Sequence, residues 1–246
     1  MKPLVILVSL VCFVSGEKTF FDSSNTYIQY RHWVVSERGI LIFNFRTFKQ
    51  NSLLLYTDGG SGSNDFLKLQ LINEKLVVHT NFGSGTETFE LGEKLSNGVF
   101  HSVQINVEAG LLTVYLDQSF SKEKRFDNSA ADNILQIQTA VFIGGVSKFY
   151  TTDMVEKNLA LEPRFTGCIK GLKFTRTDGE TFGTPNVENE EGTTDGCGET
   201  SCDSLSFTDS CRNGGRCEAQ LDESHICNCE RTGYSGEKCT TGMFCL

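Results

Sequence analysis

The chain of 246 residues has little proline, a deficit of basic charge and no long apolar segment. It contains three prolines, and 31 acidic residues oppose 22 basic ones, which gives a formal net charge of −9. A nucleic-acid ligand needs a basic face for its phosphates, so this charge argues against one. The most apolar stretch, Leu4 to Val14, is shorter than the roughly 20 residues that cross a bilayer. We therefore expect neither a nucleic-acid partner nor a membrane span.

A recognisable catalytic constellation is also missing from the sequence. The glycine-rich stretches at 59–64 and 83–85 lack the lysine and helix of a phosphate-binding loop, and no Gly-x-Ser-x-Gly element occurs. Four histidines fall in no motif with a nucleophile or with metal-ligand spacing: His32, His79, His101 and His225. We expect His101 to be a structural residue of a strand hairpin, and we predict that the protein is not an enzyme.

The N-terminus has the layout of a secretory signal. Lys2 precedes the apolar run, and the small-residue end at 14–16 fits cleavage after Gly16. We therefore predict a signal peptide over residues 1–16 and a secreted chain that starts at Glu17.

Cysteine usage agrees with an oxidising compartment. Cys12 would leave with the signal, and eight of the other nine cysteines lie between Cys168 and Cys239, which is typical of a disulfide framework. Cys245 has no obvious partner. It could join another chain, begin a domain that this product lacks, or remain a free thiol.

Between about residues 27 and 174 the apolar positions repeat with period two, which indicates strands rather than helices. In "HSVQINV" (101–107) and "LTVYL" (112–116) apolar and polar residues alternate, and the turn at 108–110 joins them into a hairpin. Further strands are expected at "ILIFNF", "LLLYT", "KLVVHT", "TFEL" and "AVFIGG". Many short strands separated by turn residues favour an all-β antiparallel sandwich.

After an acidic stretch at 183–201 the chain ends in a small cysteine-rich unit. Fewer than about 40 residues cannot bury enough apolar surface to fold without cross-links. Its cysteines are separated by eight, five, nine, one and nine residues: Cys202, Cys211, Cys217, Cys227, Cys229 and Cys239. Six cysteines alone leave fifteen pairings open.

This spacing, with "CRNGGRC" and "CERTGYSGEKC", closely resembles an EGF-like module. The resemblance implies disulfides from Cys202 to Cys217, Cys211 to Cys227 and Cys229 to Cys239. Calcium-binding members carry an acidic stretch before the first cysteine, which "CGET" does not supply, so we predict no calcium in this module.

The larger domain resembles laminin G domains, also called LNS domains, as found in neurexins, agrin, perlecan and laminins. The resemblance rests on "GILIFNF", "DFLKLQL", "NGVFHSVQINVEAGLLTVYLD", "VFIGG" and "FTGCIKGLKF", in that order. It implies a two-sheet jelly-roll sandwich and a disulfide from Cys168 to Cys197. The predicted divisions are a signal (1–16), a laminin G-like domain (17–197), a linker (198–201), an EGF-like domain (202–239) and a tail (240–246).

The resemblance also implies a possible calcium site at one rim of the sandwich. Calcium prefers six to eight oxygen ligands. The family's aspartate ligand matches Asp65, and its second side-chain ligand matches Gln138, with Asp132 or Asn133 as substitutes if the loop is shifted. Because Gln138 is neutral, binding would be weak. Asp65 could equally be a turn residue that starts its strand.

Our leading hypothesis is a non-catalytic adhesion or receptor-ligand module of the extracellular matrix or cell surface, which binds an extracellular protein or glycoprotein through loops at Asp65, 84–86 and 132–138. A second is a soluble lectin that binds glycan directly, with Phe66 and Phe82 as its aromatic platform. A third is a structural fragment of a longer matrix or neurexin-like protein.

Overall fold

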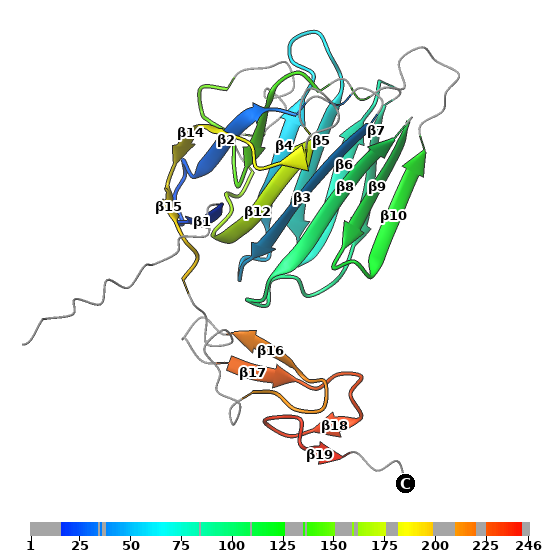
Figure 1. The fold of residues 1–246 in the computed structure, drawn as a ribbon, viewed down its shortest axis with the longest axis vertical. Coiled ribbons are helices and arrows are strands. Elements are labelled where there is room, and N and C mark those ends of the chain that lie inside the picture. The colour runs from blue at the N-terminus through cyan, green and yellow to red at the C-terminus, as the bar shows by residue number, and fades with distance from the viewer. Residues whose placement is uncertain are drawn as a thin grey trace, which may run out of the picture.

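The computed structural model is a two-layer β-sandwich followed by a small cysteine-rich unit (Figure 1). It describes residues 16–33, 35, 38–83, 85–108, 110–125, 135, 137–150, 159, 162–175, 182–198, 210–219 and 225–242. Several predictions fall outside these residues: the signal peptide apart from Gly16, and Ser84, Asp132, Asn133, Cys202 and Cys245.

The first sheet has eight antiparallel strands. In spatial order they are β10 (Phe120–Arg125), β9 (Leu111–Leu116), β8 (His101–Glu108), β3 (Arg38–Arg46), β12 (Gly167–Thr175), β1 (Glu17–Phe20) and β15 (Thr193–Asp195), while β13 (Phe182–Gly183) also pairs with β12.

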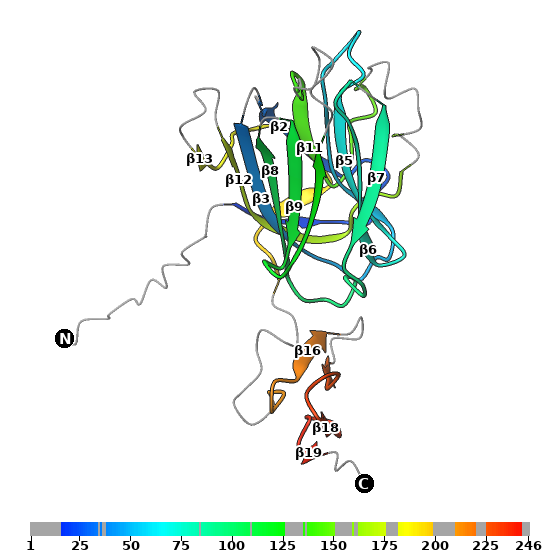
Figure 2. The same cartoon turned by 90° about the vertical axis from the view of Figure 1, so that its right-hand side faces the viewer.

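The second sheet has seven strands and packs against the first, as the side view in Figure 2 shows. In spatial order they are β14 (Val187–Glu191), β2 (Tyr27–His32), β11 (Ala140–Ile143), β4 (Ser52–Asp58), β5 (Phe66–Ile72), β6 (Lys75–Asn81) and β7 (Thr86–Leu91). Together the sheets confirm the predicted all-β antiparallel sandwich. The described part of the chain has no helix long and apolar enough to cross a membrane.

The central hairpin confirms the alternation found in the sequence. In β8, Val103, Ile105 and Val107 are buried between the sheets, whereas the intervening Gln104 and Asn106 are half-buried. The hairpin closes where Glu108 pairs with Leu111, and Gly110 takes a positive φ of 76° in the turn. Period-two patterning was sufficient here because the residues of β8 are buried on one face and only half-buried or exposed on the other.

The second sheet is buried on both faces over part of its area, which alternation did not predict. All seven residues of β4 are buried. A second apolar cluster, separate from the main core, covers the outer face of this sheet, and two of its members, Val146 and Leu159, follow β11 in the chain. The cluster consists of Tyr27, Leu53, Tyr56, Phe66, Phe142, Val146 and Leu159.

The C-terminal unit (residues 210–242) consists of two short hairpins. β16 (Arg216–Ala219) pairs with β17 (His225–Asn228), and β18 (Tyr234–Ser235) pairs with β19 (Thr241–Gly242). Disulfides join Cys211 to Cys227 and Cys229 to Cys239. With so little apolar surface buried, these cross-links carry the unit's stability.

A partly buried histidine, His79 in β6, lies beside a lysine. Its Nδ1 is 3.0 Å from Thr88 Oγ1, and its Nε2 is buried without a partner among the described residues. Burial, and to a lesser degree the charge of Lys68, lower the pKa of His79, while Glu162 partly offsets them. Protonation would place a second N–H where nothing accepts it, next to an existing cation.

We expect the folding stability to fall as the pH drops from the unfolded-state pKa of His79, 6.5, toward its lower folded-state pKa. In that window the unfolded chain holds more protons than the folded one, so acid favours unfolding. Urea denaturation of wild type and His79→Gln at pH 7.5 and pH 5 measures this. The variant should lose less stability than wild type on acidification, and His32→Gln, an exposed control, should behave like wild type. Equal losses in all three proteins would contradict the assignment.

Candidate functional site

The loop between β4 and β5, residues 59–65, forms the rim of the sandwich at the end away from the C-terminal unit (Figure 1). Its backbone closes on itself, because the Gly59 N–H donates to the Asp65 carbonyl at 2.9 Å. Gly60 and Gly62 have positive φ angles of 81° and 82°, which favour glycine. The Asp65 N–H donates to Ser63 Oγ at 3.1 Å. These local bonds give the rim a defined shape.

A buried carboxylate, that of Asp58 at the end of β4, anchors the base of this rim. Its Oδ2 accepts a hydrogen bond from the Tyr56 hydroxyl at 2.8 Å. Its Oδ1 accepts three at 2.9 Å, from the Gly60 N–H and the hydroxyls of Thr139 and Tyr150. Donors from three separate parts of the chain therefore meet at one group, and a buried carboxylate needs such partners.

Asp58 was not among the site residues predicted from the sequence. The available signal was an aspartate that directly follows the apolar "LLLYT" run, two residues after Tyr56 and therefore on the same strand face. The partners Thr139 and Tyr150 are 81 and 92 residues away in the sequence, so no local pattern could reveal them.

The two residues matched to calcium ligands lie at the same rim. Asp65 is only 6% exposed. The Gln138 N–H donates to the Asp58 carbonyl at 3.1 Å, and its side chain is exposed. The structure thus places both residues against the segment 58–60. In the described part of the chain, no three His, Cys, Asp or Glu side chains cluster closely enough to hold a metal ion.

The proposed aromatic platform for sugar was wrong. Phe66 is 7% exposed and Phe82 is fully buried, so neither presents a ring to solvent. Phe66 packs in the cluster on the outer face of the second sheet, and Phe82 belongs to the main core.

A different aromatic residue, Phe149, is 80% exposed and held on a fixed support. Its N–H donates to Ser147 Oγ at 3.2 Å, and the next N–H, of Tyr150, donates to the Ser147 carbonyl at 3.0 Å. Tyr150 in turn donates to Asp58 and packs on Phe142 with ring centroids 4.5 Å apart. The Phe149 ring therefore projects from a segment whose next residue is anchored in the sandwich.

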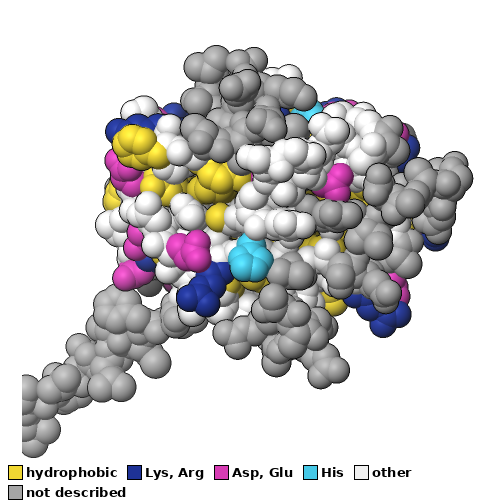
Figure 3. Space-filling model, turned by 90° about the horizontal axis from the view of Figure 1, so that it is seen from above, with side chains coloured by type: hydrophobic (Ala, Val, Ile, Leu, Met, Phe, Trp, Pro, Cys, Tyr) yellow, Lys and Arg dark blue, Asp and Glu magenta, His cyan; other side chains and the backbone are white. Residues whose placement is uncertain are grey.

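The described residues at the rim end carry charges of both signs. Figure 3 views the sandwich from this end and shows apolar side chains toward one edge, with acidic and basic side chains among the polar ones. The Lys148 Nζ lies 5.1 Å from the centroid of the Phe149 ring. This surface suits mixed apolar and polar contacts rather than the capture of a polyanion.

At the opposite end of the sandwich, His101 is a satisfied structural histidine, as predicted. It is buried, its Nδ1 is 2.8 Å from Asp117 Oδ2, and its Nε2 is 3.1 Å from Asn97 Oδ1. Both ring nitrogens therefore have hydrogen-bond partners within the sandwich.

The structure joins six cysteines in three pairs that match the family pairings: Cys168 with Cys197, Cys211 with Cys227, and Cys229 with Cys239. Cys217 is also disulfide-bonded. The first of these bonds ties β12 to the segment that follows β15.

Comparison with known proteins gives consistent matches. Residues 45–177 match the laminin G domain family. Neurexin 1 of Drosophila melanogaster is 26% identical over 266 residues, covering 96% of this chain, and Neurexin-2 of Rattus norvegicus is 25% identical over 245 residues, covering 98%. The chain spans only 14% of the length of either relative.

Among solved structures, domains LG4-5 of the mouse laminin alpha1 chain align with a TM-score of 0.59 at 18% identity, over 74% of this chain and 47% of that one. At that identity the likeness concerns the fold.

The Asp58 network makes a testable contribution to stability. Tyr150→Phe removes one hydrogen bond to a buried carboxylate and should lower the free energy of unfolding by about 1–2 kcal/mol. Asp58→Ala leaves several buried donors without an acceptor and should lower it by about 3 kcal/mol or more. Urea denaturation measures both. Tyr115→Phe, on a half-buried tyrosine of β9, is the matched control and should change stability by less than about 0.5 kcal/mol. A Tyr150→Phe cost no larger than the control's would contradict the network's role.

Proposed function

Because this chain belongs to the laminin G domain family, we propose that it is a secreted, non-catalytic adhesion or receptor-binding module whose rim recognises an extracellular protein or glycoprotein. The observation that carries this proposal is the exposed Phe149 ring on its anchored support. Fold alone does not fix function, so the argument rests on this site.

Phe149 has the properties of a binding hot spot. Aromatic side chains contribute much of the energy of protein interfaces when they enter an apolar pocket on the partner. Since Ser147 and the Tyr150 anchor already hold the segment, little conformational entropy is lost when a partner binds. Lys148 beside the ring favours a partner pocket flanked by acidic groups.

Calcium at the rim is part of the proposal, as a weak site. Asp65 supplies a carboxylate and Gln138 an amide oxygen, and both border the segment 58–60. This donor set fits calcium chemically, but a single charged ligand gives low affinity. When bound, the ion would supply a positive charge at the rim that a partner's oxygen atoms could share.

The C-terminal unit fits the role of an EGF-like spacer. Its two disulfides between described cysteines and its paired short hairpins make a rigid body from few residues. Disulfides of this density also agree with a secreted protein.

Replacement of Phe149 by alanine should weaken partner binding by at least about tenfold, as expected for a hot-spot aromatic. The measurement is binding of the immobilised full chain to an array of extracellular protein ectodomains, beside a glycan array. Ile226→Ala removes an exposed apolar side chain from the C-terminal unit and should leave binding unchanged. A protein hit that binds Phe149→Ala as tightly as wild type would contradict the assignment, and saturable binding to glycans alone would favour the lectin hypothesis.

Calcium should raise the thermal unfolding midpoint of wild type relative to EDTA, because a ligand that binds only the folded state stabilises it. Asp65→Asn should remove most of this response, and Gln138→Ala should reduce it. Asp22→Asn changes an exposed aspartate outside the rim and serves as the control. No response of wild type in millimolar calcium would show that Asp65 acts only as a turn residue.

A further inference from the structure

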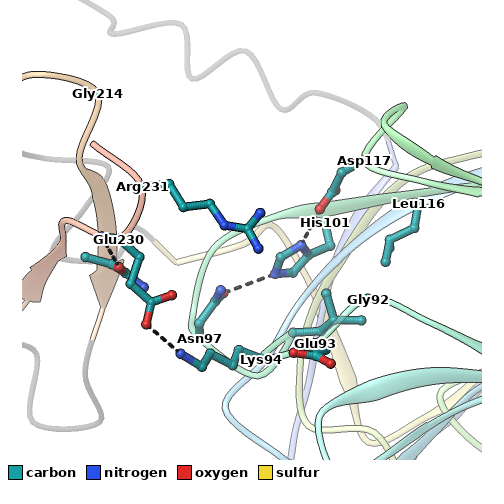
Figure 4. A pocket seen from close by; sticks show the side chains of 12 residues that line it. Gly92, Glu93, Lys94, Asn97, His101, Leu116, Asp117, Gly214, Glu230 and Arg231 are labelled. Carbon is teal, nitrogen blue, oxygen red and sulfur yellow. Dashed lines mark hydrogen bonds and ion pairs between the residues drawn. The ribbon is translucent and has the colours of Figure 1, made fainter. Parts of the chain in front are cut away.

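A cleft of about 530 Å³ separates the lower end of the sandwich from the C-terminal unit (Figure 4). One wall is the loop between β7 and β8, including Glu93, Lys94 and Asn97, together with Asp117 after β9. The other wall includes Glu230 and Arg231. The volume lies within the range of ligand sites, roughly 300–1,000 Å³.

The sandwich wall is fixed locally, and an exposed ion pair links it to the wall of the C-terminal unit. Asp117 accepts hydrogen bonds from His101 and from the Ser102 N–H, which holds the sandwich wall in place. An ion pair between Lys94 and Glu230, 3.0 Å apart, bridges the cleft. Both of its side chains are largely exposed, so solvent and salt screen it strongly.

Unusual backbone conformations are concentrated at this cleft. Of the eight described non-glycine residues with positive φ, three line it: Lys94 at 55°, Asp117 at 51° and Arg231 at 63°. The left-handed region costs free energy for residues with a Cβ, and such costs gather at functional sites. At position 231 a glycine would relieve that cost but would lose the guanidinium.

Two opposite charges face the cleft without a partner among the described residues. No hydrogen bond or ion pair links Arg231 or Glu93 to any residue that the structure describes. Figure 4 shows Arg231 extending from the C-terminal unit across the cleft toward Asn97 and His101. A guanidinium in this position can bind a carboxylate through two parallel N–H donors.

We propose that this cleft binds a peptide segment of a partner protein that carries a carboxylate beside a basic or N–H donor group, with Arg231 clamping the carboxylate and Glu93 accepting the peptide N–H or the basic side chain. Three carboxylates line the cleft, those of Glu93, Asp117 and Glu230. They would repel a polyanionic glycan, whereas a peptide offers both an anion and donors. Because the cleft lies at the opposite end from the Asp65 rim, this proposal stands independently of the proposed function.

The test is NMR of the ¹⁵N-labelled full chain, titrated with a capped pentapeptide that has a central glutamate beside a lysine. Saturable shifts are expected at the amides of Gly92, Gly214 and Asn228. The same peptide with glutamine in place of glutamate should bind about tenfold more weakly, and Arg231→Gln should weaken the glutamate peptide about equally, because both changes remove the same charge-assisted pair. Arg231→Gln keeps a side chain at the same backbone position, so the comparison isolates the guanidinium.

Arg125→Gln, at the far end of β10, is the matched control and should bind the peptide as wild type does. Unchanged affinity in Arg231→Gln, or the absence of shifts at the cleft amides up to 10 mM peptide, would overturn the proposal. Stronger binding of a heparin or hyaluronan tetrasaccharide at these amides would overturn the peptide assignment.

Discussion

The carboxylate of Asp58 connects the interior of the sandwich to its rim. A carboxylate removed from water must be satisfied by donors, and here they come from β4, from the loop after it, from the approach to β11 and from Tyr150. The same group therefore fixes the loop that carries Asp65 and the segment that presents Phe149. A rim held in this way loses little entropy on binding, which is the physical basis of the proposed recognition.

The two ends of the sandwich offer different chemistry. At the rim, one exposed ring is supported by partly buried hydrogen bonds, so a preformed contact centred on that ring is expected there. At the other end an exposed ion pair joins the cleft walls, and the Arg231 and Glu93 side chains line the cleft, so a charge-assisted contact is expected there. Together they would allow one short chain to contact two partners, or two parts of one partner, on opposite sides.

Much of the fold was predictable because its signals are local. The β8–β9 hairpin followed from alternation and a turn, and the cysteine pairs of the described residues agree with the family pairing. The site was predicted less well. Phe66 begins β5, whose residues alternate with polar ones, and was expected to face solvent, but side chains that follow β11 cover that face. The pairing of Asp58 with Thr139 and Tyr150 depends on contacts between distant segments, which no window of sequence contains.

By itself, the sequence determined the period of the strands, the positions of the turns, the separation of a sandwich from a cross-linked unit and the placement of Asp65 at the start of a strand. These depend on the preferences of each residue and its immediate neighbours. Only the tertiary structure decided that the Phe149 ring reaches solvent, that the Asp58 carboxylate is buried and that Arg231 lines a cleft beside the sandwich. Those outcomes depend on which surfaces cover one another, because burial is a property of the packed chain and not of any residue in it.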